Sequence, residues 1–228
     1  MEELKSLVKD LEDLKKEYNE EEQIKILQDI GKKLLTEYII QVGDVTIQPL
    51  WVEAYYRDIK KFDDESVHGN DKQKEFDCFY FHHKTDDQRS GVDICLSKGD
   101  YYLSYLLKYT LVNGVFTTQS QLSGKIPAEV RNKTGILVKK ESPTDVLQCA
   151  KRIGISSGKF KDAKLAIVRD INQRFVNAAG QKKSLPQKIE LVKEYIQAVY
   201  QEEERETEEQ KAAISRLLVG EYWKTLFD

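Results

Sequence analysis

Residues 44–56 read DVTIQPLWVEAYY, and in this stretch the apolar side chains begin to recur with a period of two. Alternation with that period is typical of a β-strand that buries one face. Three later stretches share the pattern: EFDCFYFHH (75–83), GVDICLS (91–97) and YYLSYLLKYTLV (101–112). The turn sequences KTDDQRSG and KGD join these three stretches, which indicates antiparallel neighbours. The centre of the chain is therefore predicted to form an antiparallel sheet.

Helical patterns flank this predicted sheet. The spacing of apolar residues predicts helices over 2–18, 21–38, 143–153 and 159–175, and a long one that begins at 186. The expected fold class is α+β, an antiparallel β-sheet core, partly barrel-like, flanked by N-terminal and C-terminal helices. We expect three parts: an N-terminal amphipathic helix (1–20), an α+β domain (21–185) and a C-terminal helical extension packed on that domain (186–228).

The composition bounds the class of protein. A net charge of -3 over 228 residues argues against a protein that coats nucleic acid through bulk electrostatics, although it is compatible with a local basic patch. No apolar run is long enough to cross a bilayer, and MEELKSLVKD does not resemble a signal peptide, so we expect a cytoplasmic protein with no membrane partner. The three cysteines form no CxxC pair and lack zinc-site spacing with the three histidines, so we expect buried thiols and no metal.

Glu53 is the unusual residue of the central stretch, since it stands among apolar and aromatic neighbours. Strict alternation places five side chains on one face: Val45, Ile47, Trp51, Glu53 and Tyr55. Desolvation beside an indole and a phenol tends to raise the pKa of a carboxylate toward the range useful in acid or base chemistry. A structural ion pair with a lysine or arginine produces the same pattern, and a bulge at Pro49 would turn Glu53 to the other face.

Two other predicted strands add polar side chains to this face. In 75–83 one face carries Phe76, Cys78, Tyr80 and His82. The opposite face carries Phe79 and Phe81, which are natural core residues. In 91–97, Asp93 alternates with apolar residues, so we expect it to lie with Tyr80 and His82 opposite the core. A sheet face that combines Glu, Tyr, His and Asp is typical of a pocket, while His82 is also compatible with a purely structural histidine.

One longer stretch combines part of a predicted helix, a predicted strand and a loop; it reads DIGKKLLTEYIIQVGDVTIQPLWVEAYY, followed by DESVHGN. It resembles the alkyladenine (3-methylpurine) DNA glycosylase family, whose members have a helix, a strand with an ETEAY-like motif and a loop histidine in this order. SGVDICLS, YLLKYTLVNG (105–114) and DAKLAIVRD (162–170) resemble later segments of that family. The resemblance spans roughly 24–175 in short segments. The chain departs from the pattern by the insertion RDIKKFDDES and by lacking a counterpart of the RN..MF..PG segment.

The resemblance implies a hydrolase that cleaves the N-glycosidic bond of a damaged or modified base in DNA, most simply a purine, after the base flips out of the helix. Glu53 matches the general base that activates water. The matched base-binding positions are Tyr55, His68, Tyr80, Asp93 and Lys108, with His82 beside them on the predicted face. Asp93 stands where the family has a pocket asparagine, and Lys108 where it has an arginine. The resemblance implies DNA as partner and no cofactor.

Two other functions are compatible with the same sequence. The fold could bind a base or nucleotide without reacting with it, or the terminal helices could bind a protein partner through the leucine stripe at 4–14 and LLVGEYWKTLF (217–227). Fold alone does not decide among these functions, so the residues of the site have to separate them.

Overall fold

The computed structural model describes residues 1–13, 19–58, 62–82, 91–140, 148–150, 152, 155 and 158–168. The chain divides into two compact units, Met1–Arg169 and Asp170–Asp228, and the described residues all belong to the first. Several expectations lie outside the described residues: the end of the first helix (14–18), the turn at 84–90, the helix segments 143–147 and 169–175, and the C-terminal extension from 186.

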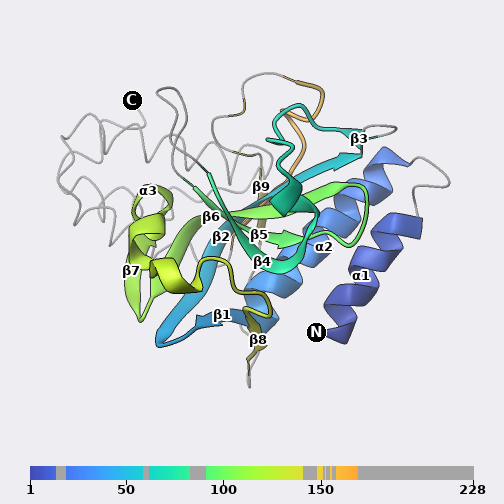
Figure 1. Ribbon diagram of the computed structural model, residues 1–228. Helices are drawn as coiled ribbons and strands as arrows, with labels where there is room; N and C mark the ends of the chain where they lie inside the picture. Colours follow the sequence, from blue (N-terminus) through green and yellow to red (C-terminus); the bar gives the residue numbers. More distant parts are fainter. Residues whose placement is uncertain are drawn as a thin grey trace, which may run out of the picture. The chain divides into compact units, whose positions relative to one another are not determined.

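The fold is α+β, as predicted, and is built on one antiparallel sheet that curls into a half-barrel (Figure 1). The described strands are β1 (Tyr38–Val42), β2 (Val45–Asp58), β3 (Phe62–Asp63), β4 (Phe76–Phe81), β5 (Val92–Leu96), β6 (Tyr102–Val112), β7 (Val115–Thr118), β8 (Leu137–Lys139), β9 (Gln148–Ala150) and β10 (Ala166–Val168). The main strand order is β4-β5-β6-β2-β1-β8; β3 and β10 also pair with β2, β7 pairs with β6, and β9 pairs with β10.

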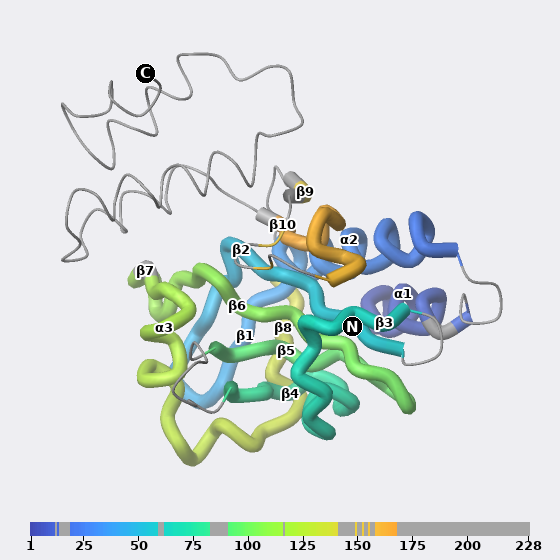
Figure 2. The backbone as a smooth tube through the Cα atoms, turned by 90° about the horizontal axis from the view of Figure 1, so that it is seen from above, coloured from blue at the N-terminus to red at the C-terminus, as the bar shows by residue number. Residues whose placement is uncertain are grey.

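Two N-terminal helices, α1 (Glu2–Asp13) and α2 (Glu20–Glu37), lie side by side next to the sheet (Figure 2). The side chain of Asn19 caps α2 by accepting a hydrogen bond from the backbone N–H of Glu22. The remaining helical turns are short: α3 (Gln119–Leu122), η1 (Asp71–Lys74), η2 (Ser123–Lys125) and η3 (Ala128–Val130). Within the described residues, no helix combines the length and the apolar character that a membrane span requires.

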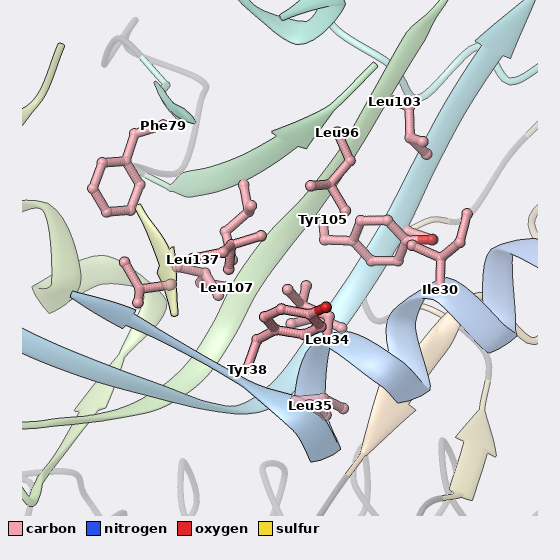
Figure 3. Close-up of a cluster of buried hydrophobic side chains, with 14 of the residues drawn as sticks. Ile30, Leu34, Leu35, Tyr38, Phe79, Leu96, Leu103, Tyr105, Leu107 and Leu137 are labelled. Carbon is pink, nitrogen blue, oxygen red and sulfur yellow. The ribbon is translucent and has the colours of Figure 1, made fainter. Parts of the chain in front are cut away.

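One hydrophobic core joins the helices to the sheet. Ala54 of β2, Tyr105 of β6, Ile94 of β5 and Phe79 of β4 are paired in register and form a core row across four strands. Helix α2 packs against this face, and the Tyr105 hydroxyl donates a hydrogen bond to the backbone carbonyl of Leu27 (Figure 3 shows the surrounding side chains). The leucine stripe of α1 enters the same core, since Leu4 and Leu11 are fully buried there.

Gly31 marks the closest approach of α2 to the sheet, because a Cβ built there would lie 2.6 Å from Ile167 Cδ1 and 3.1 Å from Tyr105 Cε1. Both neighbours are fully buried, so Gly31→Ala is expected to overpack the core and destabilise the fold by about 1 kcal/mol or more, after its gain in helix propensity is deducted. Gly124→Ala is the control, since no heavy atom lies within 4 Å of its added Cβ. Urea denaturation of both variants checks this; equal stabilities would contradict the tight packing.

Two segments predicted as helices contain short strands where the structure describes them. The part of 143–153 that the structure describes contains β9, and the part of 159–175 contains β10. In β10, Ala166 and Ile167 are fully buried and pair with β2, so tertiary pairing overrides the helical preference of DAKLAIVRD. The strand β1 was also missed, because it follows α2 without any linker and continues its apolar pattern.

A bulge in β4 turns Phe76 away from the face on which it was predicted. Asp77 has a left-handed backbone (φ 57°), and the register of β4 against β5 shifts between Phe76 and Cys78. Phe76 therefore packs against the main core instead of sharing a face with Cys78. The Asp77 carboxylate accepts hydrogen bonds from the backbone N–H groups of Ile136 and Leu137, so this bulge also holds the segment that leads into β8.

Candidate functional site

The face of the sheet opposite the core row carries polar side chains from four adjacent strands. Glu53 of β2 pairs with Leu106 of β6, Leu106 pairs with Asp93 of β5, and Asp93 pairs with Tyr80 of β4. Directly paired residues point to the same side of a sheet, so these four share a face. We call this set of mostly buried side chains the polar face; it comprises Glu53, Tyr55, Tyr80, His82, Asp93, Ser104, Leu106 and Lys108. Tyr80, His82 and Asp93 lie opposite the core, as the alternation predicts.

Two irregularities in the pairing of β2 with β6 determine the direction of Glu53. The register shifts between Pro49 and Trp51 and shifts back between Trp51 and Val52. The extra residues are Leu50 in β2 and Lys108 in β6. Because one extra residue on each strand cancels the other, the register beyond Val52 equals the register before Pro49. The bulge anticipated at Pro49 exists, but it is compensated.

The bulge nevertheless changes which residues of β2 share a face. Ile47 belongs to the core together with Val52 and Ala54, and Val45 packs against the same core. The prediction that Val45 and Ile47 lie on the face of Glu53 is therefore wrong, since the extra residue inverts the alternation between the two halves of the strand. Glu53 itself lies on the polar face.

Glu53 is fully buried and its charge is compensated. Its Oε2 accepts a hydrogen bond from the Tyr55 hydroxyl at 3.2 Å and lies 3.6 Å from the Lys108 Nζ. The ion pair anticipated as an alternative for Glu53 is therefore present, and the bulge in β6 supplies the lysine. Burial, followed by the negative charge of Glu53, raises the pKa of Tyr55 well above its ordinary value, so Tyr55 acts as a neutral hydrogen-bond donor.

A buried arginine contacts Tyr55 and the backbone of β2 next to Glu53. The Arg152 guanidinium lies 4.9 Å from the centroid of the Tyr55 ring. Its Nη1 lies 2.6 Å from Asp64 Oδ2 and donates to the backbone carbonyl of Ala54, and its Nη2 donates to Asp64 Oδ1 and to the carbonyl of Phe160. Both members of the pair are buried. Arg152 therefore fixes the edge of β2 next to Glu53.

Asp93 is held by three donors from three elements. Its Oδ1 lies 2.7 Å from His82 Nε2, and its Oδ2 accepts hydrogen bonds from Ser104 Oγ at 2.7 Å and from Gln73 Nε2 at 3.4 Å. Gln73, in η1, also donates to Ser104 Oγ. The carboxylate is buried, and these contacts direct it toward His82.

Two histidines and a tyrosine line the β4 side of the polar face. His68, from the loop after β3, lies with its Nδ1 3.2 Å from the Tyr80 hydroxyl, and its ring centroid is 4.4 Å from that of His82. Burial and the adjacent His82 charge lower the pKa of His68. Burial opposes the charged form of His82, but the charge and hydrogen bond of Asp93 outweigh it and raise the pKa of His82. The pKa values of the two neighbouring imidazoles are thus shifted in opposite directions.

This opposition has a measurable consequence. We expect the His82 ring to titrate above the ordinary value of 6.5 and the His68 ring below it. His82 therefore contributes stability that is full below about pH 6.5 and lost as the pH rises through its raised pKa. His68 contributes stability that is present above that value and lost as the pH falls through its lowered pKa. NMR titration of the ring protons, assigned with H68Q and H82Q, checks both; the reverse order would contradict the geometry.

All sequence-predicted site residues lie in described segments, yet their surroundings differ. Tyr55, Lys108 and Glu53 form one group, and His68, Tyr80, His82 and Asp93 form a second on the other side of Leu106. Tyr56 packs in the core against Phe62 and Tyr101, so Tyr55 alone faces the site. Sequence reasoning missed Asp64, Gln73, Ser104 and Arg152. Of these, Ser104 had a signal, since it alternates with Tyr105 in the same phase as Lys108.

The described residues also form a groove that is separate from the polar face. A groove of about 450 Å³ between α1 and α2 is lined by Glu3, Ser6, Leu7, Asp29, Lys32, Lys33, Thr36 and Glu37, none of which belongs to the polar face. Its charged groups pair with one another, as Lys33 does with Glu3 and Glu37.

In the part of the chain that the structure describes, no group of three or more His, Cys, Asp or Glu residues could hold a metal ion. No protein-family model matches the chain, and no curated protein matches it either.

Proposed function

We propose that the polar face is the active site of a DNA N-glycosylase, which hydrolyses the bond between the sugar and a damaged or modified base, most simply a purine. The observation that supports it most is that Glu53 and Tyr80 share the polar face, with Leu106 and Asp93 between them and with the rings of His68 and His82 beside Tyr80. Neighbouring strands lie about 4.8 Å apart, so β2 and β4 are separated by roughly 14 Å across β6 and β5. That spacing leaves room for a flat nucleobase and its sugar.

The chemistry explains why a carboxylate is needed there. Cleavage of a C1'–N bond passes through an oxocarbenium-like state, which a nearby carboxylate stabilises while it accepts a proton from the attacking water. Glu53 has this role in the proposal. Tyr55 and Lys108 orient its carboxylate, and Arg152 holds Tyr55 in place.

The base itself is held on the β4 side. Nucleobases removed from the stack are bound by flat rings and by hydrogen bonds to their edges. Tyr80, His68 and His82 supply both, since their rings lie within 6.1 Å of one another and each has a polar atom. DNA is the proposed partner, and the cytoplasm is the proposed location.

A second candidate function is binding of a base or nucleotide without hydrolysis. The observation that favours it is the complete burial of the Glu53 side chain beside Lys108, because a paired, buried carboxylate can be purely structural. Under this alternative the polar face binds the same ligand but releases no base.

A glycosylase assay separates the two. Duplex and single-stranded oligonucleotides that carry hypoxanthine, 7-methylguanine or another modified purine are incubated with the protein, and strand cleavage by alkali reports abasic sites. We expect abasic sites for at least one substrate, with unmodified DNA as the control. Binding without cleavage on every substrate would support the second candidate and contradict the first.

A further inference from the structure

The ring of His82 is anchored through one nitrogen. Nε2 faces Asp93 Oδ1 at 2.7 Å, and the backbone N–H of His82 donates to the carbonyl of Gly91 at 3.0 Å. Ser104 and Gln73 occupy the other oxygen of Asp93, so the carboxylate cannot turn away without losing these hydrogen bonds. A carboxylate on one imidazole nitrogen fixes the orientation of the ring and stabilises its protonated form.

The second nitrogen, Nδ1, lies beside Gly91. A Cβ built on Gly91 would lie 2.9 Å from Leu106 Cδ1, 3.2 Å from Gln119 Nε2 and 3.3 Å from Nδ1, so only a glycine lets these groups come this close. Among the described residues, none makes a hydrogen bond with Nδ1, and the His82 side chain keeps 10% of its surface exposed. Nδ1 is therefore the nitrogen of the ring that remains for a ligand, which would reach it through the exposed part of the side chain.

The groups that face His82 favour its charged form. Asp93 of β5 brings a negative charge into direct contact, while Tyr80 of β4 and His68 of the loop after β3 are the other titratable groups whose rings adjoin it. The pKa of Tyr80 is raised and that of His68 is lowered, so both neighbours are neutral near pH 7. Asp93 thus favours the protonated form of His82, the one neighbouring group of these three whose pKa its charge and hydrogen bond together raise.

We infer that His82 is the general acid that protonates the departing base, with Asp93 as its positioning residue; this inference rests on the proposed function. In the step, water oxygen bonds to C1', and the electron pair of the breaking C1'–N bond passes to the base. Glu53 accepts a proton from the water, and His82 Nδ1–H gives its proton to a ring nitrogen of the base. The sugar gains OH and the base gains H, and solvent returns the proton from Glu53 to His82.

Leaving groups of different charge test the inference. A neutral base such as hypoxanthine needs a proton to depart, whereas 7-methylguanine is already cationic in the nucleotide. We expect H82Q to lower the single-turnover rate on hypoxanthine by about 10²-fold or more, and the rate on 7-methylguanine by less than about 3-fold. The wild-type rate on hypoxanthine is expected to fall as the pH rises through the His82 pKa. H82Q removes this pH limb, and D93N moves it to lower pH.

Controls make the outcomes distinct. H68Q changes the neighbouring imidazole, so it should affect both substrates alike, and H82N repeats the measurement should H82Q lose its fold by circular dichroism. Equal losses on the two substrates for H82Q and H82N, with an active wild type, would overturn the role of His82 and leave the proposed function standing. A wild type inactive on both substrates would overturn the proposed function and this inference with it.

Discussion

Replacing Glu53 with glutamine is expected to lower the single-turnover rate of base release by about 10²- to 10⁴-fold, the range that a positioned general base contributes. The amide keeps the shape of the side chain and can still accept the hydrogen bond from the Tyr55 hydroxyl, but it cannot take a proton from water. The reaction is run with protein in excess over a modified oligonucleotide, and chromatography measures the free base that is released.

The ion pair with Lys108 requires a control, because E53Q removes the negative charge that lies 3.6 Å from this buried lysine. The double variant E53Q/K108Q removes both charges, so it separates the loss of catalysis from any loss of stability. We expect the double variant to fold and to be as inactive as E53Q. A rate within about 3-fold of the wild type in either variant would remove Glu53 from the role of general base.

Asp64→Asn is expected to have the largest effect on stability, a loss of about 3–5 kcal/mol in the free energy of unfolding, because it leaves the buried Arg152 guanidinium without its counter-charge. The geometry is bidentate, with Oδ2 2.6 Å from Nη1 and Oδ1 3.3 Å from Nη2. The same substitution disturbs the Tyr55 ring that Arg152 covers, so the rate of base release should fall as well. Urea denaturation followed by near-ultraviolet circular dichroism measures the stability.

The adjacent residue supplies a matched control. Asp63 also pairs with an arginine, Arg57, at 2.6 Å, but 52% of its side-chain surface is exposed. Asp63→Asn makes the same chemical change one position away and is expected to cost only about 0–1 kcal/mol. Equal losses for D63N and D64N would show that the Arg152 pair does not stabilise the edge of β2.

The central sheet could be predicted from the sequence because its strands are long and alternate clearly. In β4 and β5, Tyr80, His82 and Asp93 were placed together on one face by the alternation alone, and the pairing agrees. The side chains of β2 beyond the bulge followed the same rule, so that Glu53 and Tyr56 lie on opposite faces. The period of a strand is a local property, and sequence patterns report it well.

The remaining features depend on contacts that no local pattern encodes. The compensated bulge at Leu50 and Lys108 arises from two strands at once, so Pro49 indicated an irregularity but not its cancellation. Arg152 is 88 residues from Asp64 in sequence, and its segment was predicted as a helix. Three-residue strands such as β10 are too short to show a period, and their conformation is set by the edge that they join.

The affinity for two abasic-site analogues tests most directly whether Glu53 stabilises the positive charge that develops on the sugar. A duplex oligonucleotide with a pyrrolidine at the abasic position mimics the cationic transition state, and one with a tetrahydrofuran is its neutral counterpart. We expect the wild-type protein to bind the pyrrolidine at least about 10²-fold more tightly, as transition-state complementarity requires, and E53Q to lose this preference. Equal affinity of the wild type for the two analogues would contradict the account.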